Sequence, residues 1–310
     1  MKNNLRATVS VPATTANLGP GFDAFGMAFA LSNRFTIAFA DRPTFIGTDK
    51  KYQNTDNIVY RACQHVFLLQ VGREIPISIA FETEIPTGRG LGSSASCIIA
   101  GLSAANALCD NPYTKEELLN MATEMEGHPD NVAPALYGGL TVSSKTDQGI
   151  FTKKMTPHSS YRYTLLVPDR ELKTAQSRQE IEQNVRLQDA IDNIANGALM
   201  IQSLTDGDPS ALKVAARDKL YESRRKKAIP DFDRIKEQAL NSGYLCCVIS
   251  GAGPTLLCIS KTEKDNAETS FPFPGNLAWK WQSQVLPVDL KGCQIKLSQG
   301  GFHAEKISDR

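Results

Sequence analysis

Residues 86–96 read PTGRGLGSSAS: three glycines at alternate positions, then hydroxyl side chains, then the apolar run CIIAGLSAAN at 97–106. Glycine lets the backbone approach a ligand closely and turn its N–H groups inward. A helix that begins near Ser93 would direct its positive end to the same place. The stretch therefore predicts an anion site or a flexible turn before a buried helix, and its spacing alone does not decide between them. It has no lysine of the Walker A type, and Ser93 stands where the Rossmann pattern needs glycine.

The composition of the whole chain is that of an ordinary globular protein. Its 310 residues are 41% hydrophobic and 22% charged, with 34 basic against 33 acidic side chains. This length favours two domains, and the balanced charge argues against a nucleic-acid partner. The start lacks a signal-peptide pattern, and no run approaches the roughly 18–20 apolar residues that span a bilayer. We therefore expect a cytoplasmic protein with no membrane partner.

The seven cysteines form an odd set without a CxxC pair, and the four histidines lack zinc-site spacing. Free cysteines of this kind are usually buried thiols, so neither disulfides nor a zinc site is expected.

Hydrophobic periodicity predicts mixed α and β structure in both halves. Strands are expected at 7–16, 34–40, 77–85 and 161–169, and a glycine turn between two strands at 243–260. Helices are expected at 55–72, with Asp56 as a cap, at 94–110, and at 114–127, where Thr114 and Glu117 match a capping box. The polar stretch 145–160 is the expected domain boundary. The chain after about residue 262 is expected to give the last helix and edge strand of the second domain.

Four segments, in order along the chain, resemble motifs of the GHMP kinases in their homoserine kinase form. They are VPATTANLGPGFDAFGMAF, PTGRGLGSSAS, EGHPDNVAPALYGGL and ISGAGPTLLCI. The resemblance implies an α+β, two-domain GHMP kinase fold. Residues 1–156 would form a ribosomal-protein-S5-like α/β domain that binds ATP, and residues 157–310 a ferredoxin-like α+β domain. The implied activity is ATP-dependent phosphorylation of the side-chain hydroxyl of L-homoserine to O-phospho-L-homoserine, in threonine biosynthesis. Another small alcohol is the alternative substrate, and a homodimer is common in the family.

The resemblance also implies the residues of a nucleotide site. Those around ATP would be Asn57 near the adenine, and Pro86, Thr87, Gly88, Arg89, Gly90, Leu91, Gly92, Ser93, Ser94, Ala95 and Ser96 around the phosphates. Ser94 and Glu124 would hold Mg²⁺. Asn57 could instead cap its own helix, and Glu124 could lie on a solvated helix face.

A zwitterionic amino acid needs a cationic fork for its carboxylate and acceptors for its ammonium group. The resemblance assigns the fork to Arg178 and Arg225, although Arg224 could exchange roles with Arg225. It places Asn17, Asp23, His128 and Asp130 around the amino and hydroxyl ends. Thr174 would lie near the γ-phosphate. Mevalonate kinase has an aspartate where this chain has Asn131, so Asn131 could orient the hydroxyl but could not take its proton.

Overall fold

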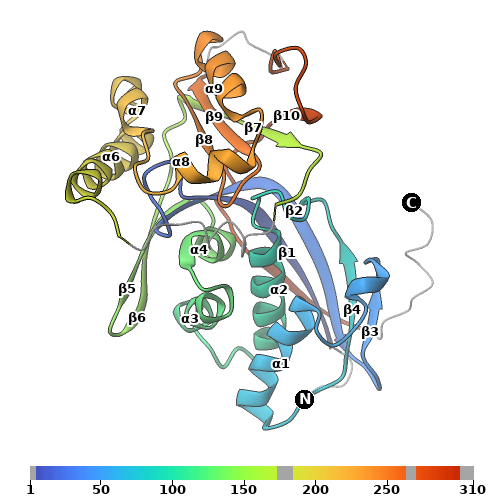
Figure 1. The fold of residues 1–310 in the computed structure, drawn as a ribbon. Helices are drawn as coiled ribbons and strands as arrows, with labels where there is room; N and C mark the ends of the chain where they lie inside the picture. The colour runs from blue at the N-terminus through green and yellow to red at the C-terminus, as the bar shows by residue number, and fades with distance from the viewer. Residues whose placement is uncertain (1–4, 173–183, 263–269, 301–310) are drawn as a thin grey trace.

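The computed structural model describes residues 5–172, 184–262 and 270–300 (Figure 1). Two sheets organise the fold, the first with strand order β11-β1-β2-β4-β3 and with β5 and β6 added beside β2, the second with order β10-β7-β9-β8. The strands are β1 Leu5–Ala16, β2 Phe25–Phe39, β3 Thr44–Ile46, β4 Ile77–Glu82, β5 Leu140–Thr146, β6 Gly149–Met155, β7 Tyr161–Pro168, β8 Cys246–Ile249, β9 Leu256–Lys261, β10 Trp281–Val285 and β11 Gln294–Gln299. The helices are η1 Lys50–Tyr52, α1 Ile58–Val71, α2 Ser93–Leu108, α3 Lys115–Glu126, α4 Pro129–Tyr137, α6 Leu187–Asp206, α7 Pro209–Ala215, α8 Glu222–Arg225, η2 Lys226–Ala228 and α9 Phe232–Asn241.

Helices α1 to α4 cover one face of the first sheet, and their apolar sides meet β1, β2 and β4 in a continuous core (Figure 1). A second core joins the far ends of β1 and β2 to β7, β8 and β9 and to helices α6 and α7. A third lies between α9 and the other face of the second sheet. The α+β layers predicted for both halves are therefore present.

Local signals placed both ends of α3 correctly. The capping box at Thr114 forms in both directions with Glu117, and α3 ends at Gly127, which has a left-handed backbone. The cap of α1 is Asn57 and not Asp56, because the Asn57 side chain accepts from the N–H groups of Val59 and Tyr60. An N-cap must directly precede the first helical residue to reach those groups, and Asp56 lies one position too early.

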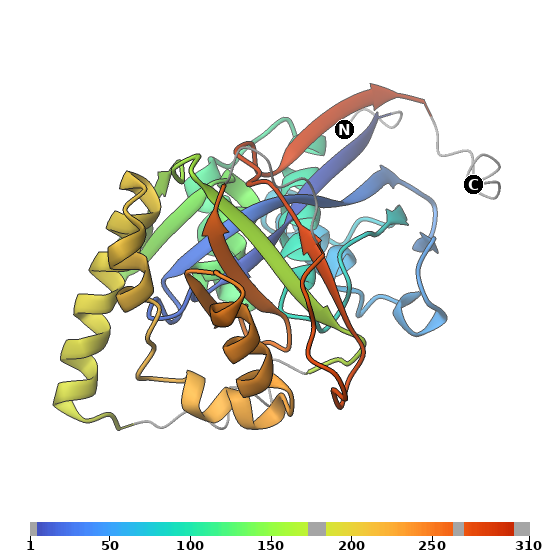
Figure 2. The ribbon, with the colours of Figure 1, turned by 90° about the horizontal axis from the view of Figure 1, so that it is seen from above.

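The polar stretch of residues 145–160 contains β6, which forms a hairpin with β5, and its place as a domain boundary stays a prediction. The expectation for the segment after about residue 262 was wrong in part. Residues 270–300 contain no helix, and although β10 does form an edge of the second sheet, β11 returns to the first sheet and pairs with β1 (Figure 2). Strand alternation shows that a segment is extended but not which sheet it joins. The domain extents 1–156 and 157–310 stay a prediction.

Within the described residues, no helix combines the length and the apolar character needed to cross a membrane.

Helix α2 lies at the centre of the first core because its residues are small on all sides. Thirteen of its 16 residues are buried. At Gly101 an added Cβ would lie 2.5 Å from the Val59 carbonyl oxygen and 2.6 Å from Ala62 Cβ, both on α1. The missing side chain thus sets the closeness of α1 and α2.

We expect Gly101→Ala to lower the free energy of unfolding by about 1–2 kcal/mol, because overpacking against α1 outweighs the better helix propensity of alanine. Gly197→Ala on α6 is the matched control, since its Cβ would meet Phe25 at an ordinary 3.4 Å. The control should be neutral or more stable by up to about 1 kcal/mol. Urea unfolding of the three proteins measures this, and equal stability of both variants would contradict the packing argument.

Candidate functional site

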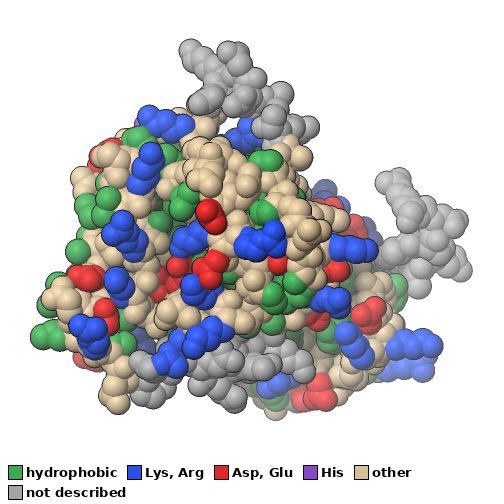
Figure 3. All heavy atoms as spheres, turned by 45° about the horizontal axis from the view of Figure 1, so that its top comes forward, with side chains coloured by type: hydrophobic (Ala, Val, Ile, Leu, Met, Phe, Trp, Pro, Cys, Tyr) green, Lys and Arg blue, Asp and Glu red, His purple; other side chains and the backbone are tan. Residues whose placement is uncertain are grey.

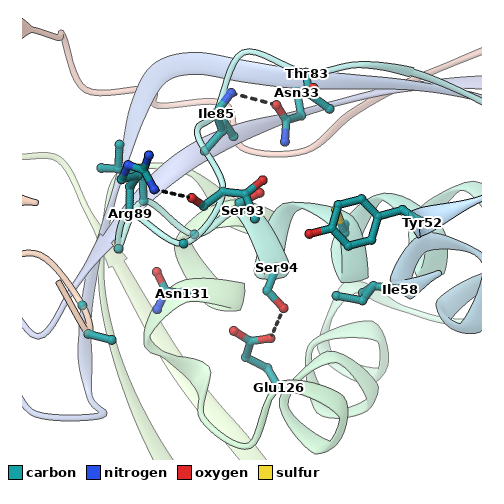
Figure 4. Close-up of a pocket in the computed structure, with 18 of the residues that line it drawn as sticks. Asn33, Tyr52, Ile58, Thr83, Ile85, Arg89, Ser93, Ser94, Glu126 and Asn131 are labelled. Atoms are coloured by element: carbon teal, nitrogen blue, oxygen red, sulfur yellow. Dashed lines mark hydrogen bonds between the residues drawn. The ribbon is translucent and has the colours of Figure 1, made fainter. Parts of the chain in front are cut away.

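One cavity of about 560 Å³ lies where the glycine-rich segments of the chain meet, and it is lined from both halves of the fold. It is bordered by the β1–β2 loop, the loop of residues 86–92, the starts of α2 and α4, the residue Arg225 of α8, and Gly251 with Ala252 between β8 and β9. Figure 4 shows several of the side chains that line it. Lys and Arg side chains are interspersed with Asp and Glu over the face of the molecule seen in Figure 3.

The loop of residues 86–92 leads into the N-terminus of α2. Gly88, Gly90 and Gly92 have φ values of 65°, 75° and 69°, in the left-handed region that favours glycine. The Ser96 N–H donates to the Gly92 carbonyl at 2.8 Å, which closes the first turn of α2. The N–H groups of the preceding turn have no partner inside a helix and carry its positive end. Of the two interpretations of PTGRGLGSSAS, the structure therefore favours the anion site.

The same loop is fixed to its surroundings by hydrogen bonds. Ser250 Oγ donates to the Gly90 carbonyl at 2.6 Å, and a Cβ at Gly90 would lie 2.3 Å from the Ser250 carbonyl oxygen. The Arg89 side chain donates to the carbonyls of Pro168 at 2.9 Å and Asp169 at 3.1 Å. Arg89 thus ties the loop to the end of β7, and its Nη1 also lies 3.5 Å from Oε1 of Glu171.

Ser94 was predicted to bind Mg²⁺ together with Glu124. The carboxylate that lies beside Ser94 in the structure is that of Glu126. Ser94 Oγ donates to Glu126 Oε2 at 2.9 Å, and both residues line the cavity (Figure 4). Glu124 is exposed on α3 and lies outside the lining. Two residues apart on a helix means about 200° of rotation, so only one of the two can face Ser94. A hydroxyl and a carboxylate beside an anion site are ligands that suit Mg²⁺.

The lining also includes an apolar wall, formed by Tyr52, Ile58, Phe81 and Cys97. Asn57 also lines the cavity, while its side chain caps α1 and donates to the Tyr52 carbonyl at 2.9 Å, so its capping role and its place in the cavity coexist. Burial raises the pKa of Cys97 to about 12, a shift to which nearby Glu126 adds and which the Ser96 hydrogen bond opposes. The thiol is therefore protonated at neutral pH and adds to the apolar wall.

Polar residues predicted for a substrate gather at the start of α4. Asn17, Asp23, His128 and Asp130 all line the cavity. One ligand atom from each of Asp23, His128 and Asp130 lies within 4.8 Å of the others, and His128 Nδ1 is in close contact with Asp130 Oδ1. Asn17 and Asp23 also have positive φ values, 70° and 58°, so they shape the turn as well as border the cavity.

Arg225 is the arginine that faces this cluster. It is 4% exposed, lines the cavity and donates from Nη1 to the Gly251 carbonyl at 2.5 Å. Its guanidinium lies over the rings of Phe22 and Tyr221, at 5.5 and 4.7 Å from their centroids. Arg224 is half-buried and is not part of the lining. Of the two neighbouring arginines, Arg225 is therefore the one whose guanidinium a ligand in the cavity could reach.

A partly buried acid, Asp218, precedes helix α8, which carries Arg225. The Asp218 carboxylate accepts from the N–H groups of Leu220, Tyr221 and Glu222. Burial raises the pKa of Asp218, and these donors and the Arg225 charge oppose the rise. Tyr221 Oη in turn donates to the Gly19 carbonyl at 2.9 Å, which links α8 to the β1–β2 loop.

Residue Asn131 lines the cavity and is 9% exposed, and Thr14 Oγ1 donates to its Oδ1 at 2.8 Å. Thr174 and Arg178 lie outside the described residues. Two side-chain contacts at the site were not predicted from the sequence: that of Glu126 with Ser94 and that of Thr14 with Asn131. The helical phase of α3 relative to Ser94 could have indicated Glu126, whereas no local signal links Thr14 to a residue 117 positions away.

Comparison with known proteins gives the class. The family model for the GHMP kinases N terminal domain matches residues 57–139, and the one for the GHMP kinases C terminal domain matches residues 200–273. The chain belongs to the GHMP kinase family, as its four motifs predicted, and it has the predicted two-domain fold.

The individual relatives are more specific. A protein named homoserine kinase from Clostridium botulinum (strain Okra / Type B1) is 37% identical over 289 residues, which cover 93% of this chain and 97% of that one. Homoserine kinase from Clostridium beijerinckii is 38% identical over 83% of this chain and 87% of its own length. The crystal structure of homoserine kinase from Cytophaga hutchinsonii superposes with a TM-score of 0.81 at 28% identity, over 96% of this chain and 98% of that one.

The raised pKa of Asp218 predicts a pH dependence of stability. Because the folded pKa lies above the unfolded one, the carboxyl stabilises the fold fully below the unfolded value of about 4. That contribution is lost as the pH rises through the folded pKa. The free energy of unfolding of the unsubstituted protein, minus that of Asp218→Asn, should therefore fall from pH 4 towards pH 7.

Urea unfolding of both proteins across this range measures the difference. Asp206→Asn, which changes an exposed acid at the end of α6, gives the baseline for loss of a surface carboxylate. A difference that rises with pH would contradict the argument.

Proposed function

We propose that this chain is an ATP-dependent homoserine kinase, which forms O-phospho-L-homoserine for threonine biosynthesis. The observation that carries the proposal is a cavity with two different polar ends. The loop of residues 86–92 and the Ser94–Glu126 pair lie at one side, and Arg225 with the Asp23–His128–Asp130 cluster at another. The names of the relatives agree with this assignment.

The nucleotide end suits a triphosphate. Left-handed glycines and the start of a 16-residue helix provide backbone N–H groups for phosphate oxygens. The apolar wall formed by Tyr52, Ile58 and Phe81 suits a flat base. In this proposal Ser94 and Glu126 hold Mg²⁺. A bound Mg²⁺ would neutralise part of the phosphate charge during transfer.

The substrate end suits a zwitterion. Arg225, held by the Gly251 carbonyl and by two aromatic rings, offers a fixed guanidinium to a carboxylate. Asp23 and Asp130 offer acceptors to an ammonium group, and His128, in close contact with Asp130, lines the cavity beside them. Arg178 remains the proposed second half of the fork, and Thr174 remains proposed for the γ-phosphate, both on the basis of the motif alone.

Catalysis in this proposal comes from alignment. The homoserine oxygen attacks the γ-phosphorus, the bond to the ADP oxygen breaks, and the hydroxyl proton passes to the phosphate or to solvent. Asn131 orients the hydroxyl and, as an amide, takes no proton. Positioning of the reacting groups can lower the barrier to phosphoryl transfer substantially, and this does not require a protein base. We further propose that the enzyme works in the cytoplasm, and a homodimer stays a prediction.

The test is ATP consumption by the purified protein with Mg²⁺ and, in separate wells, L-homoserine, mevalonate, galactose or L-serine. We expect turnover with homoserine and little with the others. Only homoserine combines the carboxylate and ammonium groups of an amino acid with a side chain long enough to bring its hydroxyl to the γ-phosphate. Turnover with only mevalonate or only galactose would still agree with ATP binding by the loop of residues 86–92, but it would overturn the assignment of homoserine as the substrate.

Two arginine variants sharpen the same assay. Arg225→Lys should raise the KM for homoserine by about tenfold or more and leave the KM for ATP within about threefold, because lysine cannot keep both the stacked position and the bidentate contact. Arg224→Lys, the neighbour outside the cavity, should change neither. A rise of both Michaelis constants in Arg225→Lys would point to a general loss of structure.

Two glutamates of α3, Glu126 in the cavity and Glu124 outside it, allow the proposed Mg²⁺ site to be tested with a matched control. Glu126→Gln should raise the Mg²⁺ concentration for half-maximal rate by about tenfold or more, because an amide is a weaker ligand for a hard cation than a carboxylate. Glu124→Gln, two residues away and exposed, should leave it unchanged. Titration of the rate with Mg²⁺ at saturating ATP and homoserine gives both values. Equal effects of the two substitutions would remove Glu126 from the metal site.

A further inference from the structure

The hydrogen bond between Thr14 and Asn131 joins a buried residue of β1 to a cavity residue of α4. Thr14 is fully buried and does not line the cavity, whereas Asn131 does. We propose that Thr14 is a positioning residue: its hydroxyl fixes the orientation of the Asn131 amide, so that Asn131 presents its NH₂ group to the substrate hydroxyl. The identity of the substrate hydroxyl in this inference rests on the proposed function, whereas the contacts of Thr14 and Asn131 are those of the structure.

Two neighbours fix the amide in the same sense. Thr14 Oγ1 donates to Asn131 Oδ1 at 2.8 Å, and Asn131 Nδ2 donates to Asp130 Oδ1 at 3.4 Å. A flipped amide would place its oxygen against a carboxylate, which offers only acceptors when ionised. The amide oxygen is therefore engaged by Thr14, and the NH₂ group is the end left to face Asp130 and the cavity.

Thr14 is itself held by the elements that form the site. It pairs with Ala28 across β1 and β2, and its N–H donates to the Leu91 carbonyl of the phosphate loop at 3.1 Å. The hydrogen bond to Asn131 passes beside Gly92, where an added Cβ would lie 1.9 Å from Thr14 Oγ1 and 3.3 Å from Asn131 Oδ1. The strand, the loop and α4 are thus aligned with one another at this hydroxyl.

A consequence for the reaction follows from this orientation. An NH₂ group that donates to the substrate oxygen leaves a lone pair of that oxygen free for attack and directs the hydroxyl proton elsewhere. Loss of the Thr14 hydroxyl would allow the Asn131 amide to rotate without loss of either binding subsite. The effect should therefore fall on kcat and not on the Michaelis constants.

The test combines substitutions at both ends of the bond. Thr14→Val, which keeps the branched shape, should lower kcat by about 10–100-fold with both KM values within about threefold. Thr14→Ser should restore kcat to within about threefold. Thr15→Val is the matched control, because the Thr15 hydroxyl is equally buried and has no hydrogen-bond partner among the described residues, and it should leave kcat unchanged.

A double-mutant cycle shows whether Thr14 acts through Asn131. In an Asn131→Ala background, Thr14→Val should lower kcat by less than about threefold. A fall as large as in the unsubstituted background, or a serine variant no better than valine, would overturn the proposal.

A spectroscopic arm separates this inference from the proposed function. The side-chain NH₂ signals of Asn131, identified in a ¹⁵N-correlated spectrum by their absence from Asn131→Asp, should move in Thr14→Val and stay in place in Thr14→Ser. If homoserine is not turned over by the unsubstituted protein, the proposed function fails, and these signals still decide the inference. Signals that do not move in Thr14→Val would overturn it.

Discussion

The close approach of three backbone segments around Gly90 and Gly92 is the constraint on which the site depends. Side chains at these positions would overlap the Ser250 carbonyl and the Thr14 hydroxyl. Without side chains there, the loop of residues 86–92 lies between β1 and the β8–β9 turn and forms hydrogen bonds to both. The glycines therefore do more than bend the loop towards a ligand, because they also allow the two halves of the fold to meet along one edge of the cavity.

The Gly251 carbonyl continues this arrangement on the substrate side. It accepts hydrogen bonds from Asn17 Nδ2 at 3.0 Å and from Arg225 Nη1 at 2.5 Å. One backbone oxygen thus joins the β1–β2 loop, α8 and the β8–β9 turn. A charge-assisted bond of this kind is stronger than a neutral one, and it restricts a long side chain that would otherwise sample many rotamers. Arg225 is oriented before any ligand arrives.

The parts of the site that the sequence predicted are those determined by local chemistry. The glycine loop, the capping box at Thr114 and the polar residues at the start of α4 each depend on spacing within a few residues, and each lies where it was expected. Glu126 was missed because the choice between it and Glu124 depends on the rotation of α3 about its axis relative to Ser94. Thr14 was missed because its partner is distant in sequence, and Arg225 could be separated from Arg224 only by its burial.

The return of β11 to the first sheet has a consequence for how the chain reaches this structure. Its residues pair with Leu5–Ser10 of β1, so the outermost ladder of the first sheet joins the two ends of the described chain. At about 5–20 residues per second, the ribosome would need roughly 15–60 s to supply that last strand after β1 has emerged. During synthesis the edge of β1 is therefore an open template for other extended chains. We expect this edge to be the part of the nascent chain that most needs protection by a chaperone.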